Sequence, residues 1–240
     1  MQFTPLLGPE SKSIFYCKDN IFYAKGNWES LEYSCELKLS PESMSWQWSV
    51  TVKNTVDSFH ELDLIYVQDV GLKPVSNNLV NEYYVSQYIE RLVLKHNSYG
   101  SVVCCRQNTK EITGNPWLML ACKNSAASAS TDGIQFLGKT YRETRVPEGL
   151  KSKKLGGEYA GEHSIVALQE KPFILTGKQE HQSVFVATYQ HDHPEATSKQ
   201  DLKRIPGLIL EFREKDLENT SGNYFVRDYN LFREAAILPV

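Results

Sequence analysis

The 240-residue sequence predicts an all-β fold: a large antiparallel β-sandwich with a helical segment at its C-terminal end. Three observations support this prediction. Short segments rich in Val, Ile, Tyr, Trp and Leu fill the first three-quarters of the chain. Clusters of Gly, Pro, Asn, Asp and Ser separate these segments, as in strands joined by turns. No helical patterns alternate with them, which favours a sandwich larger than an immunoglobulin domain over a parallel sheet.

The first clear pattern predicts an antiparallel hairpin. Segment 31-LEYSCELKL-39 alternates apolar and polar residues, as a half-buried strand does. After the turn 40-SPES-43, segment 45-SWQWSVTVK-53 alternates again and places Trp46 and Trp48 on the same side.

Later segments are apolar on both faces. In 61-ELDLIYVQDV-70, Leu62 and Leu64 share one face while Ile65 and Val67 fall on the other, so we expect this strand to be covered on both faces. Further strands are predicted at 101–105, 117–122, 134–138, 164–169 and 183–189, with turns at 113–116 and 131–133.

Segment 81-NEYYVSQYIERLVLK-95 fits two structures. Val85, Ile89 and Leu92 have helical spacing behind Asn81, a good N-cap. Its many tyrosines and β-branched residues favour a strand, which is the interpretation we adopt.

The pattern changes near residue 191. Segment 192-DHPEATSKQDLKRI-205 begins with Asp192 and Pro194 and ends in basic residues, which predicts a helix. We therefore expect a sandwich over residues 1–190 and the start of a helical linker over 191–240. The apolar end 236-AILPV-240 is unlike an exposed terminus, so we expect the chain to be cut from a longer protein.

Composition indicates which classes of partner and which cellular compartment to expect. The formal net charge is −3 and the only dense basic cluster is 151-KSKK-154, so no nucleic-acid partner is expected. No apolar run approaches the ~20 residues that span a bilayer, so no membrane partner is expected. The five cysteines are odd in number and lack C-x-x-C spacing. Buried free thiols in a reducing, cytoplasmic location fit best.

Motifs for catalysis are missing from the sequence. There is no nucleophile elbow or phosphate-binding loop, and His191 and His193 alone do not complete a metal site. We predict no catalytic residue, no metal and no cofactor. A pair of catalytic carboxylates has no fixed spacing. Turn-capping and solvent-facing roles explain each acidic candidate equally well: Asp69, Glu82, Asp132, Glu143 and Glu148.

A set of aromatic, amide and acidic residues fits a carbohydrate surface, because sugars stack on rings and bond to amides and carboxylates. Its members are Trp28, Tyr66, Gln68, Asp69, Asn81, Tyr84, Gln87 and Tyr88. The same set fits a core layer with amides bonded internally, and the residues alone favour this second interpretation.

Several ordered segments together resemble the N-terminal region of glycoside hydrolase family 94, formerly glycosyltransferase family 36. They are 64-LIYVQDVGL-72, 81-NEYYVSQYIE-90, 101-SVVCCRQN-108, 116-PWLMLAC-122, 131-TDGIQFLGKTYRETRVPEGL-150 and 191-HDHPEATSKQDL-202. The resemblance covers roughly residues 20 to 205. It is greatest to the branch of 1,2-β-oligoglucan phosphorylases and cyclic β-1,2-glucan synthases.

The resemblance implies that an (α/α)6 barrel follows the sandwich through linker helices. In this family a barrel aspartate protonates the glycosidic oxygen while inorganic phosphate, the co-substrate, attacks from the opposite face. No barrel motif matches within these 240 residues. The chain is then an accessory domain, non-catalytic by itself, of an enzyme that converts β-glucan oligosaccharides to glucose 1-phosphate. It would pack against the barrel and contribute to a homodimer.

The resemblance assigns six residues to a carbohydrate-facing or inter-domain surface: Tyr66, Gln68, Asp69, Tyr84, Gln87 and Tyr88. Gln68 and Gln87 are expected to be cross-strand neighbours. A free-standing carbohydrate-binding module and a hydrolase with a carboxylate pair in the sandwich are the alternatives.

Overall fold

The computed structural model describes residues 2–8, 10–18, 21–74, 84–160 and 163–212, and the backbone of a short strand at 225–227. Strands dominate, and the chain order is β1 (Ile14–Lys18), β2 (Ile21–Trp28), β3 (Leu31–Leu39), β4 (Ser45–Asn54), β5 (Phe59–Leu62), β6 (Ile65–Asp69), β7 (Ile89–His96), β8 (Gly100–Gln107), β9 (Trp117–Cys122), β10 (Ala126–Asp132), β11 (Ser164–Glu170), β12 (Phe173–Thr176), β13 (Glu180–Gln190) and β14 (Phe225–Arg227). The helices are α2 (Gly133–Leu137), α3 (Tyr141–Thr144), α4 (Ile205–Glu211) and the 3-10 helices η1 (Glu148–Lys151) and η2 (Asp201–Arg204).

Twelve of the described strands form one sheet in the order β14-β1-β2-β3-β4-β13-β9-β8-β10-β11-β6, with β7 also paired to β8. β5 and β12 form a separate pair. The pairings are antiparallel except for one contact of β10 with β8. The predicted hairpin is confirmed as β3 and β4, which pair from Leu31↔Asn54 to Leu39↔Trp46. The predicted all-β class is confirmed as well.

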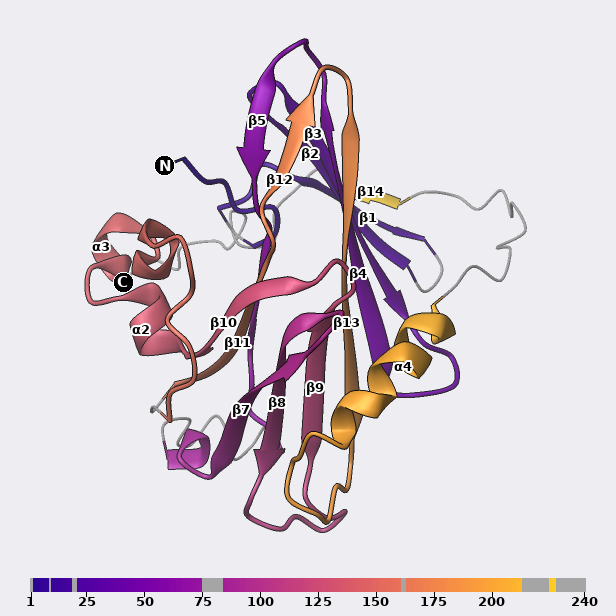
Figure 1. Ribbon diagram of the computed structural model, residues 1–240, viewed down its shortest axis with the longest axis vertical. Coiled ribbons are helices and arrows are strands. Elements are labelled where there is room, and N and C mark those ends of the chain that lie inside the picture. Colours follow the sequence, from indigo (N-terminus) through magenta and orange to yellow (C-terminus); the bar gives the residue numbers. More distant parts are fainter. Residues whose placement is uncertain are drawn as a thin grey trace, which may run out of the picture.

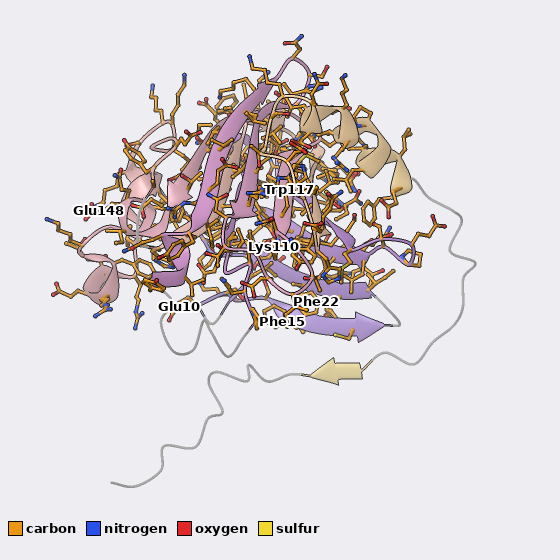
Figure 2. All side chains as sticks on the ribbon, turned by 90° about the horizontal axis from the view of Figure 1, so that it is seen from below. Glu10, Phe15, Phe22, Lys110, Trp117 and Glu148 are labelled. Atoms are coloured by element: carbon orange, nitrogen blue, oxygen red, sulfur yellow. The ribbon has the colours of Figure 1, made fainter. Side chains whose placement is uncertain are left out.

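The sheet curls so that its last strands cover its middle (Figure 1). Tyr66 of β6 packs on Phe185 of β13, with ring centroids 5.5 Å apart. Leu120 of β9 and Val166 and Leu168 of β11 belong to the same buried cluster. A second cluster lies under β1–β4, where Phe15 and Phe22 stack with centroids 5.7 Å apart (Figure 2).

The other face of β8, β9 and β13 is covered by η2 and α4 (Figure 1). Met119 and Val186 on that face pack against Ile205 and Leu208. Residues one position away, such as Leu120 and Phe185, point into the sandwich. These strands are therefore apolar on both faces because both faces are covered.

The predicted strand at 61–70 is two strands. Asp63 and Leu64 interrupt it, so β5 and β6 belong to different sheets. The expectation that both faces are covered is wrong for Val67, which is 43% exposed. β6 is the last strand of the sheet, and the helical excursion between β10 and β11 covers its outer face at Ile65, through Phe136 and Leu155.

The strand predicted at 134–138 is wrong, because this segment is helix α2. The Asp132 carboxylate accepts a hydrogen bond from the Gln135 backbone N–H at 3.1 Å and caps the helix. The neighbouring strand β10 was not predicted. Its sequence, AASASTD, consists mostly of small residues that give no apolar pattern, although six of its seven residues are buried.

For segment 81–95 the strand interpretation is confirmed from Ile89 onward and wrong before it. Residues 84–86 are helical and residues 87–88 form a turn, in which the Tyr88 N–H bonds to the Val85 carbonyl at 3.2 Å. Residues 81–83 lie outside the described part of the chain.

The helix predicted at 192–205 is wrong for its first part, because helical structure in the described residues begins only at Asp201, with η2 and then α4. Side chains before Asp201 instead form hydrogen bonds with residues at and just before the start of β9. Asp192 accepts from the Asn115 N–H at 2.9 Å, and Thr197 accepts from the Trp117 indole at 3.1 Å. The division of the chain at residue 190 stays a prediction. No helix in the described segments is long and apolar enough to cross a membrane.

Candidate functional site

A groove of about 920 Å³ opens at one end of the sandwich. Segments distant in sequence line it: residues 39–40 and 43–46 around the β3–β4 turn, residues 68–74 at the end of β6 and beyond it, residues 111–113 and Pro116 of the β8–β9 loop, Leu118 of β9, and Tyr189 near the end of β13. The β8–β9 loop lies at the bottom of Figure 1. Strand ends rather than strand faces therefore build this site.

Behind Trp46 and Gln68, which line the groove, lies a polar network set in aromatic packing. Trp46 and Trp48 share a face of β4 and lie against Tyr66 in one buried cluster. The Tyr66 hydroxyl donates to Gln68 Oε1 at 2.5 Å. Burial raises the pKa of Tyr66, and hydrogen bonds from the two tryptophan side chains oppose this rise. Gln68 thus lines the groove with its amide oxygen already bonded inside the protein.

Ionic and hydroxyl contacts tether the walls. Lys73 and Glu111 form an ion pair whose side chains are only 9% and 18% exposed. On the opposite wall, Ser43 donates to the Glu211 carboxylate of α4 at 2.6 Å. Such contacts hold the groove open in a fixed shape, as in most preformed ligand sites.

The β8–β9 loop is fixed by the segment after β13. Gly114 has a φ of +120°, and Asp192 packs directly over it. Arg106 donates to the backbone carbonyl of His193 at 2.8 Å, and the Asn115 carbonyl accepts from the His193 N–H at 2.9 Å.

The rim of the groove is apolar. Leu39 and Met44 are more than half exposed and Ile112 is fully exposed at 105%. Exposed apolar groups gathered at one opening are typical of interaction sites. Sequence reasoning missed this rim, although Ile112 is an isolated apolar residue in the polar loop 108-NTKEITGNP-116, which was an available signal.

The second predicted stretch forms an exposed aromatic pair. Tyr88 donates to the Tyr84 hydroxyl at 2.7 Å, and their rings meet edge to face with centroids 5.0 Å apart. The hydrogen bond to Tyr84 raises the pKa of Tyr88. Gln87, between them, is exposed in the turn before β7.

Gln68 and Gln87 are not cross-strand neighbours, so that prediction is wrong. Gln68 is paired with Val166 of β11, and Gln87 lies outside any strand. Ser164 nevertheless links the two stretches. Its carbonyl accepts from the Val70 N–H at 3.0 Å and its N–H donates to Ser86 Oγ at 3.2 Å.

The acidic candidates are dispersed. Asp69 lines the groove with His163 3.4 Å away. Asp132 caps α2, and Glu148 accepts from Thr140 at 3.1 Å on the helical excursion, at the edge of the molecule in Figure 2. Glu143 lies on α3, in the same excursion. Glu82 and Asn81 lie outside the described residues, and Trp28 packs under β1–β4.

His193 and four of the five cysteines are buried in the packing; Cys17 is exposed, so the expectation of buried thiols is wrong for that residue. His193 is buried, stacks on Trp117 with centroids 4.7 Å apart and lies 2.9 Å from the Asp201 carboxylate. Within the described segments no group of three or more His, Cys, Asp or Glu could hold a metal ion. Burial raises the pKa of Cys35, Cys105 and Cys122 to about 12, which keeps these thiols protonated and unreactive at neutral pH.

Comparison with known proteins identifies the family. The family model described as SOGP N-terminal domain matches residues 1–187. The chain belongs to the SOGP N-terminal domain family. This membership confirms the predicted resemblance to the 1,2-β-oligoglucan phosphorylase branch.

One relative of this SOGP N-terminal domain is a 1,2-beta-oligoglucan phosphorylase of Listeria innocua serovar 6a, 28% identical over 194 residues. The match covers 80% of this chain but only 17% of the relative.

Two solved structures show weaker likeness. A bacterial glucoamylase complexed with acarbose has a TM-score of 0.46 and 11% identity, over 83% of this chain and 27% of that chain. A polysaccharide lyase has a TM-score of 0.42 and 9% identity, over 75% of this chain and 25% of that chain. These two likenesses carry no argument about function.

The wall formed by the β8–β9 loop predicts the effect of two glycine substitutions. Gly114→Ala should lower the free energy of unfolding by about 1–3 kcal/mol, because the positive φ is strained for alanine and its Cβ would clash with the Asp192 carboxylate. Gly207→Ala is the matched control. Gly207 lies in α4 with no heavy atom within 4 Å of the added Cβ, so the substitution should stabilise by about 0.5–1 kcal/mol. Urea unfolding measures both, and equal effects would contradict the loop geometry.

The hydrogen bond from Tyr66 to Gln68 predicts that the stability of the protein depends on pH in the alkaline range. At pH 7, Tyr66→Phe should lower the free energy of unfolding by about 1–3 kcal/mol, because Gln68 loses its donor. Since burial raises the pKa of Tyr66 in the folded state, the stability tied to its protonated form is fully present below about pH 10. This contribution to stability is lost as the pH rises through the raised pKa of Tyr66 in the folded protein. The difference between native protein and variant, measured by urea unfolding from pH 7 to 11, should therefore shrink; a constant difference would refute the assignment.

Proposed function

We propose that this SOGP N-terminal domain is the non-catalytic accessory domain of a glycoside phosphorylase of glycoside hydrolase family 94. The full enzyme would use inorganic phosphate to degrade β-glucan oligosaccharides to glucose 1-phosphate. Family membership and the phosphorylase relative support this proposal. The chain spans 17% of that relative's length, which leaves room there for a separate catalytic domain.

The groove is the observation that carries the proposal. Its rim presents Leu39, Met44 and Ile112 to solvent, and covering them would remove apolar surface from water. A catalytic barrel of the same enzyme is the partner we propose for this rim. Tyr66 and Gln68 would then support the interface from below, and Asp69 would lie at its margin, facing the partner or the substrate.

The carboxylates of the groove are poorly suited to acid catalysis. Glu111 is engaged by Lys73, and the Asp69 side chain is 79% exposed. A general acid in a glycosidase is instead held protonated by a dry, apolar pocket. These placements support a non-catalytic domain over a hydrolase with its carboxylate pair in the sandwich.

A free-standing carbohydrate-binding module is the second candidate. The exposed Tyr84 and Tyr88 rings with Gln87 between them offer a stacking surface and an amide, which suits a sugar. We infer a cytoplasmic location from the five free cysteines, four of which are buried. A homodimer remains part of the proposal.

A turnover assay and a binding titration together separate the two functions. The 240-residue chain, incubated with β-1,2-glucan oligosaccharides and phosphate, should release no glucose 1-phosphate and no reducing sugar. Turnover of either kind would refute the accessory role. Calorimetric titration with the same oligosaccharides should show no saturation if a barrel is required. Saturable binding that Tyr88→Ala abolishes, and that Phe59→Ala in the separate β5–β12 pair leaves unchanged, would establish the binding module instead.

A further inference from the structure

A second hollow, of about 460 Å³, lies between the β7–β8 turn and the segment that enters α4. Lys95 and His96 line it from the first side, and Lys199 and Lys203 from the second. Leu202 and Pro206 add apolar wall. We name this hollow the basic notch.

The charge of the basic notch is not compensated by acidic side chains. Lys95, Lys199 and Lys203 are exposed, and no ion pair involves them in the described segments. Lys95 donates to Ser101 Oγ at 2.5 Å, on the sheet face that carries Val103 and Cys105. Because η2 and α4 cover the opposite face, the Lys95 ammonium group points away from Lys199 and Lys203. Asp201, the acid nearest in sequence to Lys199 and Lys203, is engaged by His193, Arg204 and the Ser198 N–H. Lys199 and Lys203 place two like charges at one hollow, which attracts an anion because its binding relieves their mutual repulsion.

His96 adds a ring N–H donor. Its Nδ1 accepts from the backbone N–H groups of Ser98 at 3.0 Å and Tyr99 at 3.3 Å. Because Nδ1 is an acceptor, the ring proton of the neutral form is on Nε2, which is left as the donor for a ligand. The Tyr99 ring, 4.7 Å away, fixes the orientation of the imidazole.

We propose that the basic notch binds a phosphate group, either as inorganic phosphate or as a phosphate monoester of a small sugar. Ammonium groups are compact point charges that bind phosphate oxygens from several directions. The volume exceeds that of one phosphate and accommodates an attached sugar, for which Leu202 and Pro206 offer apolar contact. A nucleic acid fits less well, because the basic residues form one hollow rather than a stripe and the chain carries a net charge of −3. This site is independent of the groove and of the accessory role.

Calorimetric titration of the 240-residue chain tests the proposal, with inorganic phosphate and glucose 1-phosphate as probes at constant ionic strength. Saturable binding in the millimolar range is expected for one of them. Lys199→Gln/Lys203→Gln should weaken it at least tenfold, because both ammonium groups on the η2 side of the notch are lost. The matched control is Lys151→Gln/Lys153→Gln, which removes two exposed charges from another surface and should change the affinity less than twofold.

The titration results distinguish the two ligands and can overturn the proposal. Tighter binding of glucose 1-phosphate than of phosphate identifies a monoester site, and the reverse order identifies inorganic phosphate. Absence of saturation with both probes, or equal weakening in the two double variants, overturns the proposal. The His96 ring resonances of the unmodified protein should shift during the same titration; an unmoved ring also overturns it.

Discussion

The fold depends on the pairing of β13 with two strands at once. β13 pairs with β4 from Glu180↔Lys53 to Thr188↔Ser45 and with β9 from Phe185↔Cys122 to Gln190↔Trp117. It thereby joins the β1–β4 half of the sheet to the half formed by β9, β8, β10, β11 and β6. Its side chains alternate between the sandwich interior and the surface under α4, so both faces exclude water. No other described strand connects these halves within the sheet.

The pairing of β13 with β4 and β9 also determines the shape of the groove. Tyr189 at the end of β13, Trp46 at the start of β4 and Leu118 near the start of β9 line the groove side by side. Their relative positions are set by the registers of two strand pairs rather than by the loops themselves. A rigid scaffold that presents loop residues at one end is a common way to build a binding surface. Loss of the β13 pairing would therefore remove the groove as well as the core.

Local patterns in the sequence predicted the parts of the fold that depend on local periodicity. The alternation of residues 31–53 located β3 and β4, and the two-sided apolar runs located β8, β9 and β13. Strand β10 was not predicted, because Ala and Ser pack well in a crowded central strand but do not produce an apolar pattern in the sequence. At 133–137, a helix capped by Asp132 and a strand preceded by a turn have the same local signature. At the groove, the Lys73–Glu111 pair joins residues 38 apart, which only the folded chain brings together.

Native-state hydrogen exchange of the β13 amides tests the central role of this strand most directly. The account predicts that β13 amides bonded to β4 and those bonded to β9 exchange together, at the free energy of global unfolding. The amides of β3 and β11 should open in the same cooperative step. If the β1–β4 half instead exchanges through its own opening of much lower free energy while β9 and β13 stay protected, β13 does not unite the two halves and the account is contradicted.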